Sequence, residues 1–224
     1  MTVFGLGHME GIHLNTSALS RREGTCLKRE VASRTLRLVA IPLAVGVAAC
    51  DTAIGVAVGS VAIVTWGTYP GVNKYARKNF EVLGTLIVRV HRDVVHFINP
   101  RSAPFQPESG VEGGRILLPS KDGLVAAFVQ KRLDKWIRYC KGSNFFNRHM
   151  TARLICLVAA IAFVIARVID TIIGAFTGLI SLLTFGREQF WNQLTYETLR
   201  PTMVVRDLFV CTLLFMNPAS NINN

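Results

Sequence analysis

The chain has 224 residues, of which half are hydrophobic and only 17% are charged. Soluble domains usually carry about 25% charged residues, so this composition favours either contact with lipid or an unusually dry core. The 25 Lys and Arg residues outnumber the 14 Asp and Glu residues, and the formal net charge of +11 suits an anionic partner, either nucleic acid or a negatively charged membrane surface.

Both ends of the chain are predicted to be tails. Residues 1–31 are polar and contain no apolar run of the signal-peptide type, so we expect a mobile N-terminal segment. Residues 221–224 form a short second tail. The five cysteines include no CxxC pair, which favours free thiols in a reducing compartment and no metal site.

Between the tails the chain contains an internal repeat. Residues 51–59 read DTAIGVAVG and residues 170–178 read DTIIGAFTG, an offset of 119 residues. Two later segments, NPRS and NPAS, keep almost the same spacing. The sequence therefore predicts two copies of one unit, at 32–102 and 151–220, joined by a linker at 103–150.

Each unit is predicted to be an αα-hairpin, which makes the fold class all-α. A long apolar helix ends at a glycine, Gly67 or Gly186, and an amphipathic helix follows and stops at an Asn-Pro pair. The predicted helices are 32–65 and 72–98 in the first unit, and 151–184 and 190–216 in the second.

The first helix of each unit is apolar on every side. Residues 38–66 contain one charged side chain, Asp51, and residues 154–185 contain two, Arg167 and Asp170. Both runs exceed the roughly 20 residues needed to cross a bilayer. A helix of a soluble monomeric bundle normally shows a polar face to water, and neither run has one. The pattern favours a membrane protein, and a soluble all-α oligomer acting as an interaction module is the alternative.

A stripe of small residues recurs in both apolar helices. Its members lie on one helical face because they are spaced by four, four and three residues: Asp51, Gly55, Gly59 and Ala62, then Asp170, Gly174, Gly178 and Ser181. Such glycine spacing lets helix backbones approach closely in lipid, so we expect a packing contact between the units or between two copies of the chain.

The two aspartates allow a different interpretation. A carboxylate within a membrane is costly and often functional, so Asp51 and Asp170 are candidates for a small channel or transporter. The structural alternatives are that such an aspartate caps a helix or bonds across the helix contact.

The linker carries a basic amphipathic helix, predicted at 122–141. Aromatic and aliphatic residues oppose a row of cations, Lys131, Arg132, Lys135, Arg138 and Lys141. This composition is typical of a segment that lies on an anionic membrane surface. RNA binding is the competing interpretation, but no RNP, KH or zinc-knuckle pattern accompanies the helix, so nucleic acid is disfavoured as a partner.

The sequence contains no catalytic motif. GxSxG and HExxH are absent, and the glycine-rich GVEGG at 110–114 is not followed by the GK[ST] of a phosphate-binding loop. We therefore predict a non-enzyme with no catalytic residues, no cofactor and no metal.

The predicted hairpins favour one membrane topology, in which each unit enters the bilayer and returns to the same side. If each unit enters the membrane and returns, every basic segment stays on the cytoplasmic side, as the positive-inside rule prefers. In outline this is similar to reticulon-type proteins, which carry two long hydrophobic hairpins around a polar loop. The order of DT, glycine and closing NP resembles small uncharacterised repeat proteins of chlamydia-like intracellular bacteria, a resemblance that implies a secreted host-membrane or inclusion-membrane protein. The expected function is to anchor, scaffold or shape a membrane.

Overall fold

The computed structural model describes residues 26–100, 102, 123–142, 144 and 146–218. Within them the fold is all-α, which confirms the predicted class. Most of the predicted N-terminal tail, the linker segment that contains GVEGG, and the predicted C-terminal tail lie outside the described residues.

The first hairpin consists of α2 (Cys26–Val64) and α3 (Pro70–Ile98). Helix α2 begins six residues before the predicted start at 32, so the last part of the predicted tail is helical. Pro42 lies inside α2, and the helix continues past it although proline cannot donate a backbone hydrogen bond. Pro70 occupies the first turn of α3, where its fixed φ suits a helix start.

The turn after α2 has a left-handed backbone that recurs 119 residues later. Trp66 and Gly67 have φ values of 54° and 63°, and Gly67 donates its N–H to the Ala62 carbonyl at 2.8 Å. Phe185 and Gly186, after the second apolar helix, have φ values of 53° and 65°. Glycine adopts such a conformation without strain, which explains why each helix ends where the sequence places a glycine.

The second half of the chain contains α5 (Ala152–Leu183), α6 (Gln189–Thr198) and α7 (Met203–Met216). The prediction of one continuous helix over 190–216 is wrong, because Pro201 lacks the backbone N–H that a helix interior requires. The break is held against the first hairpin by Thr202, whose Oγ1 donates to the Leu83 carbonyl at 2.7 Å.

The linker helix α4 spans Val125–Lys141, three residues shorter at its start than the predicted 122–141. It leads through a π-helical turn, η1 (Asn147–Thr151), into α5 and packs along the first half of that helix.

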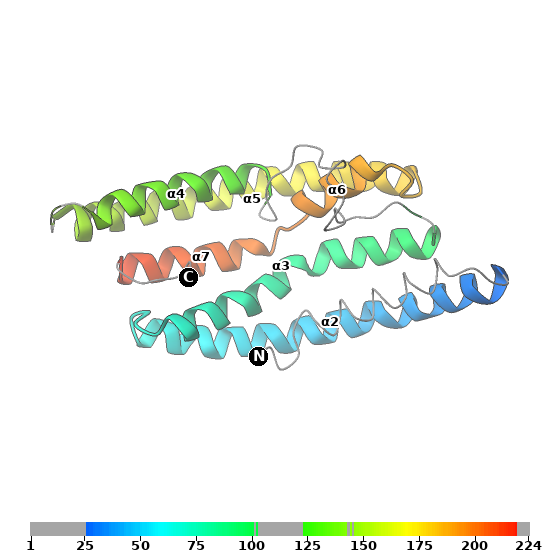
Figure 1. Cartoon of the computed structure of the whole chain (residues 1–224), viewed down its shortest axis with the longest axis horizontal. Coiled ribbons are helices and arrows are strands. Elements are labelled where there is room, and N and C mark those ends of the chain that lie inside the picture. Colours follow the sequence, from blue (N-terminus) through cyan, green and yellow to red (C-terminus); the bar gives the residue numbers. More distant parts are fainter. Residues whose placement is uncertain (1–25, 101, 103–122, 143, 145, 219–224) are drawn as a thin grey trace.

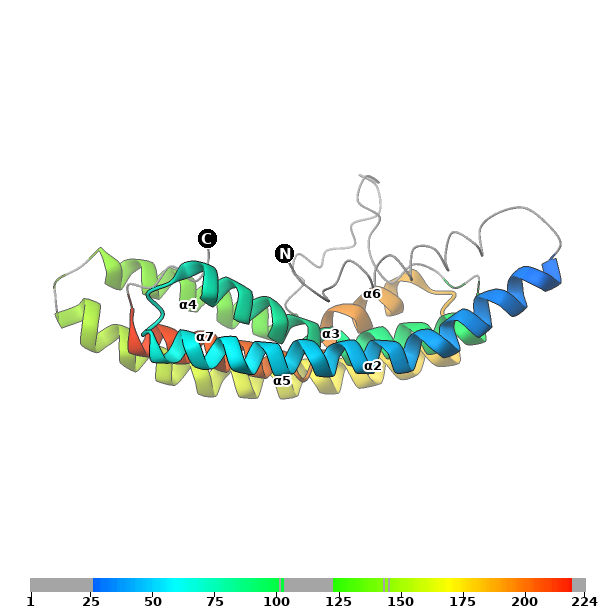
Figure 2. The ribbon, with the colours of Figure 1, turned by 90° about the horizontal axis from the view of Figure 1, so that it is seen from below.

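Figure 1 shows α2, α3, α7 and α5 side by side, with α3 and α7 in the middle where the two halves meet. Phe80 of α3 and Phe209 of α7 are in ring contact there, with centroids 5.3 Å apart. Seen from below in Figure 2, the molecule is an arc, with α2 and α5 along its convex side and α4 and α6 toward its concave side.

Candidate functional site: an apolar outer surface over a polar interior

Helix α5 is built the opposite way from a helix of a soluble protein. Its buried face is mostly small or polar, with Arg167, Asp170, Gly174, Thr177 and Ser181 among its members. Its outer face carries large apolar side chains that are 65–70% exposed, with Val158, Ile161, Ile172, Phe176 and Leu183 among them. Charged residues are rarely fully buried unless they are paired, and contiguous exposed apolar surface marks a contact site.

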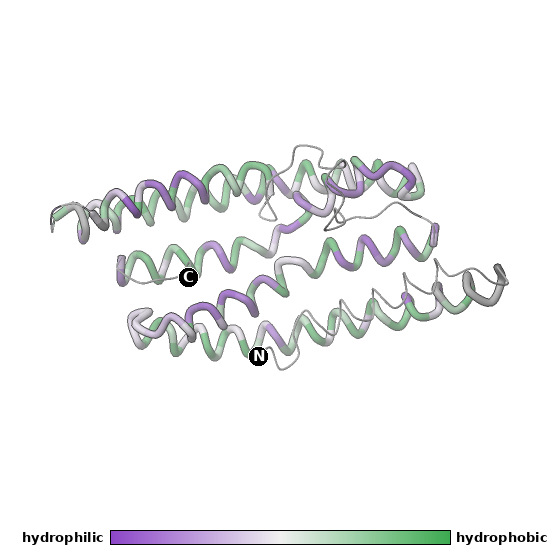
Figure 3. The backbone as a smooth tube through the Cα atoms, in the orientation of Figure 1, coloured by the Kyte–Doolittle hydropathy of each residue, from purple (hydrophilic) through white to green (hydrophobic). Residues whose placement is uncertain are grey.

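Helix α2 repeats this inverted arrangement. Arg37 and Asp51 are only 1% and 2% exposed, whereas Val39 and Val64 are 60% and 76% exposed. Figure 3 shows α2 and α5 largely in the colour of hydrophobic residues, while hydrophilic residues gather on α3, α4 and α6. The convex side of the arc is therefore apolar along most of its length.

Asp170 caps α4 from a distance. Its two carboxylate oxygens accept the first backbone N–H groups of α4, from Val125 at 2.9 Å and from Ala126 at 3.0 Å. Gly123 adopts φ +90° beside them, and a Cβ at this position would collide with Asp170 Oδ2. A carboxylate is favoured here because the N-terminus of a helix carries partial positive charge. Of the interpretations open for Asp170, this geometry is that of a structural cap.

Asp51 has different surroundings. It faces α3, where the positive charge of Arg89 is close enough to act on it. Its Oδ2 atom is buried and has no hydrogen-bond partner among the described residues. Asp51 and Asp170 therefore have separate partners, although the repeat places them at equivalent positions.

The glycine stripes let the helices of each hairpin approach closely. A Cβ built on Gly55 would lie 3.0 Å from Cβ of Asn79 on α3, and one on Gly174 would lie 2.5 Å from the backbone nitrogen of Leu199, next to α6. Ala62, the last member of the first stripe, is fully buried. Both stripes are thus covered within the chain, so their close packing needs no second copy.

Two of the glycines also touch the opposite half of the molecule. A Cβ on Gly59 would lie 3.4 Å from the ring of Phe209 on α7, and one on Gly178 would lie 3.4 Å from the ring of His91 on α3. The two stripes therefore lie against helices of their own half and also of the opposite half.

A buried ion-pair network joins α3, α5 and α7. Asp207 accepts Nε of Arg167 at 2.7 Å and Nη2 of Arg206 at 2.7 Å, and all three side chains are at most 3% exposed. Nη1 of Arg206 also reaches Glu81 on α3 at 3.3 Å. The sequence analysis did not identify this network, because its members are separated by up to 125 residues.

A second buried pair joins α2 and α3. Arg37 donates from Nη1 to Asp93 at 3.3 Å, and Arg92 approaches the same carboxylate at 3.9 Å. Buried charges of this kind are tolerated only when they are paired. The interior of the molecule is therefore where its polar interactions are made.

The two Asn-Pro pairs have a role that their prediction as helix stops did not include. Asn99, at the end of α3, donates from Nδ2 to the Phe185 carbonyl at 2.8 Å, and Asn217, at the end of α7, donates to the Trp66 carbonyl at 3.1 Å. Each asparagine thus binds the left-handed turn of the opposite half, which connects the halves reciprocally.

The predicted membrane-surface cations are exposed on α4 where their side chains are described. Lys131, Arg132, Lys135 and Arg138 face outward, whereas the side chain of Lys141 lies outside the described residues. Leu133 and Ile137 are buried on the opposite face, which packs on the rest of the molecule.

The described residues contain no group of three or more His, Cys, Asp or Glu that could hold a metal ion. Burial raises the pKa of the Cys211 thiol to about 12, so this residue offers no thiolate nucleophile at neutral pH. No family model matches the chain, and no curated protein or solved structure matches it either.

Proposed function

We propose that this protein is a non-enzymatic membrane protein that embeds the outer faces of α2 and α5 in a lipid bilayer, and thereby anchors, scaffolds or shapes that membrane. The observation that carries the proposal is the inversion of both helices, with large apolar side chains outside and ion pairs inside. Removing one exposed Val, Leu or Ile side chain from water is worth about 1.5–3 kcal/mol, so lipid contact would recover a large free energy.

The hydropathy of two segments supports contact between these helices and lipid, and their length would also allow them to cross the bilayer, which the labelling of α5 described below distinguishes. The segments Arg34–Val64 and His149–Leu183 have mean hydropathies of 2.0 and 2.4 and are long and apolar enough to cross a membrane. A bilayer has a hydrocarbon core of about 30 Å, which corresponds to roughly 20 helical residues.

The distribution of exposed charge favours a body that lies in the membrane plane. Lys74 and Lys78 on α3, and Lys131 and Lys135 on α4, are exposed along the flanks of the apolar helices. Helices that stood upright in the bilayer would carry these flanks into the hydrocarbon, where each buried lysine costs about 2.5–3.5 kcal/mol. An arc lying in the plane keeps the lysines at the surface, and all polar segments then lie on one side, proposed to be the cytoplasmic side.

The curvature of the molecule supports a shaping role. The apolar helices follow the convex side of the arc in Figure 2. Ion pairs connect α7 to α5 and to α3. A rigid curved body fits a bilayer of similar curvature better than a flat one, so it would stabilise or select such a membrane.

Transport is less well supported. A proton or ion pathway through Asp170 would have to compete with the two backbone N–H groups that this carboxylate accepts. A soluble oligomer is the stronger competitor, because a second copy could cover the same outer faces.

Two measurements on the intact chain test the proposal. Membranes containing the expressed protein are washed with alkaline carbonate, and we expect the protein to stay in the pellet. A single-cysteine version that keeps only Cys50, which is exposed on α2, should react in vesicles with a lipid-soluble maleimide but not with a water-soluble one. The matched control places the cysteine at the exposed Lys78, where the water-soluble reagent should react. Carbonate release together with free labelling of Cys50 would refute membrane embedding.

The orientation is tested separately at the two ends of α5. Met150 and Phe185 are 51% and 55% exposed, so cysteines in their place are accessible to reagents. A body in the membrane plane exposes both cysteines to an impermeant maleimide from the same side of the bilayer. Labelling from opposite sides would instead mean that α5 crosses the membrane.

A further inference from the structure

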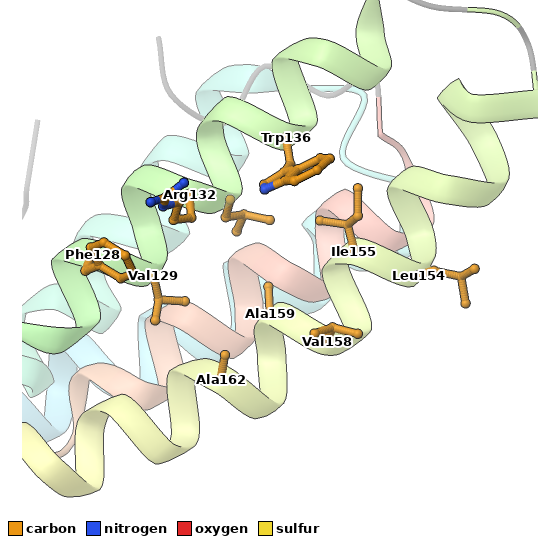
Figure 4. Close-up of a pocket in the computed structure, with 10 residues that line it drawn as sticks. Phe128, Val129, Arg132, Trp136, Leu154, Ile155, Val158, Ala159 and Ala162 are labelled. Carbon is orange, nitrogen blue, oxygen red and sulfur yellow. The ribbon is translucent and has the colours of Figure 1, made fainter.

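An apolar groove of about 440 Å³ lies between α4 and α5. This volume lies within the range of about 300–1,000 Å³ typical of small-molecule sites. Figure 4 shows Trp136 and Ile155 approaching one another from the two helices at one end of the groove, and Phe128 and Val129 at the other end. Among the residues that line it, only Arg132 is charged.

Small side chains on α5 explain why the groove exists. Ala159 and Ala162 follow the bulkier residues Ile155 and Val158 along α5, and their short side chains leave space between the two helices. Leu133 of α4, only 2% exposed, packs against the core beneath the groove. The result is an apolar groove that runs between the two helices.

The groove is continuous with the outer face of α5. Leu154 and Val158 line it and are also 61% and 68% exposed on the surface proposed to lie in the bilayer. An acyl chain of a neighbouring lipid would reach the groove from that surface without crossing water. Its long, flexible and wholly apolar shape suits this lining better than a polar ligand does.

Arg132 supplies the charge that such a lipid would need. Its guanidinium lies over the ring of Phe128, 5.1 Å from the centroid, and it makes no ion pair with any described residue. An arginine in this position is well suited to a phosphate, which it can bind through two parallel N–H groups. The exposed Lys131 and Lys135 on the same helix add positive charge beside it.

We propose that the groove between α4 and α5 binds one acyl chain of an anionic phospholipid, with Arg132 contacting the headgroup phosphate. This inference rests on the proposed function, because it needs the outer face of α5 to lie in lipid. It goes further by assigning a lipid class and a specific site, so that α4 selects the lipids around the protein as well as resting on them.

The test uses Trp136 as a reporter that lines the groove. Two full-length proteins retain one tryptophan each, Trp136 or the exposed Trp66 of the turn after α2, and the other tryptophans are replaced by phenylalanine. Each protein is reconstituted into phosphatidylcholine vesicles that contain phosphatidylglycerol, with bromine on the acyl chains of either one lipid or the other. Bromine quenches tryptophan fluorescence on contact, so the comparison reports which lipid lies beside each ring.

We expect brominated phosphatidylglycerol to be favoured at Trp136 over Trp66 about fivefold, since one basic contact with anionic lipid is worth about 1 kcal/mol and 1.4 kcal/mol corresponds to tenfold. Arg132→Gln should bring this ratio close to one. Ala159→Phe, which fills the groove, should do the same, with circular dichroism as the check on its fold. The control Arg187→Gln removes an exposed cation that follows the far end of α5 and does not line the groove, and it should leave the ratio unchanged.

A ratio near one in the unmodified groove, or a ratio that Arg132→Gln does not lower, would overturn the lipid site while the membrane proposal stands. Failure of the proposed function looks different, because neither brominated lipid would then quench either tryptophan.

Discussion

Asp170 of α5 accepts the backbone N–H of Ala126 at 3.0 Å, a bond that joins two residues 44 positions apart in the chain. With the matching bond from Val125, it makes one carboxylate the cap of a helix to which it does not belong. One of the two carboxylates that the sequence offered as a transport group thus helps to attach the basic helix α4 to the apolar helix α5.

Replacing Asp170 by asparagine should loosen the start of α4. An amide has one acceptor oxygen, so one of the two N–H groups would face an NH₂ group, and we expect a loss of about 1–2 kcal/mol, the upper range for a helix cap. Hydrogen exchange of the amides at 125–130 measures the effect directly. Asp134→Asn is the control, because this residue lies inside α4 and its carboxylate accepts from the Gln130 side chain of the same helix; equal exchange in both variants would contradict the capping role.

Gly174→Ala should destabilise the second half of the molecule. The new Cβ would lie 2.5 Å from the Leu199 nitrogen and 2.6 Å from its Cα, and backbone atoms cannot move aside as a flexible side chain can. Overpacking of this kind costs about 1–3 kcal/mol. Thermal unfolding in detergent, followed by circular dichroism, measures the loss.

The matched control is Gly46→Ala in the other apolar helix. Nothing lies within 4 Å of a Cβ at that position, so alanine should raise stability by about 0.5–1 kcal/mol through its better helix propensity. If both glycines tolerated alanine equally, the close approach of α5 to Leu199 would not hold in solution.

Asp207→Asn should be among the most damaging single changes in the chain. It leaves Arg167 and Arg206 buried without their shared carboxylate, and breaking a buried pair typically costs about 3–5 kcal/mol. Replacing all three residues by apolar side chains of similar size should recover much of the lost stability, since the buried charges are then gone. Denaturation midpoints in detergent compare the two variants. A triple variant no more stable than Asp207→Asn would contradict this expectation, because the ion pairs would then stabilise the fold more than apolar packing does.

His91 should make the fold sensitive to mild acid. Burial lowers the pKa of His91, because the charged imidazolium is poorly solvated where it packs near Gly178. The unfolded chain therefore takes up the proton first. The contribution of His91 to stability is complete above the unfolded pKa of about 6.5 and is lost as the pH falls from there through the folded pKa.

The measurement for His91 is the unfolding free energy at several pH values in the unmodified protein and in His91→Gln. The difference between the two isolates this residue from the carboxylates, which titrate in both proteins. We expect the difference to shrink as the pH falls below about 6.5. A difference that is constant with pH would show that His91 does not titrate on unfolding.

The sequence predicted well what depends on local signals. Glycine at 67 and 186 marked the ends of both apolar helices, since a left-handed backbone is easiest for that residue. Pro201 is an equally local signal for the break between α6 and α7, and the prediction of one helix over 190–216 did not use it. The apolar outer faces of α2 and α5 agree with runs that the sequence shows as apolar on every side, but their inner faces, with buried ion pairs, were not predicted.

The tertiary partners could not be predicted. Arg206 and Asp207 sit beside one another in α7, and nothing local indicates that one reaches Glu81 of α3 and the other Arg167 of α5. The same holds for Asp170, which the sequence shows three residues from Arg167 while its role as a cap depends on how α4 returns along α5. These contacts are set by the arrangement of helices, which a single sequence does not state.

The reciprocal asparagine bonds have a consequence for biosynthesis. The carbonyl of Trp66 is bound by Asn217, which leaves the ribosome 151 residues later. The side chain of Asn99 likewise lacks its partner until Phe185 is made, 86 residues later. A nascent first hairpin therefore lacks these bonds until the second half is made, while its apolar outer face is already exposed. Both halves are completed together and late, so the protein is expected to depend on a chaperone or on its target membrane throughout its synthesis.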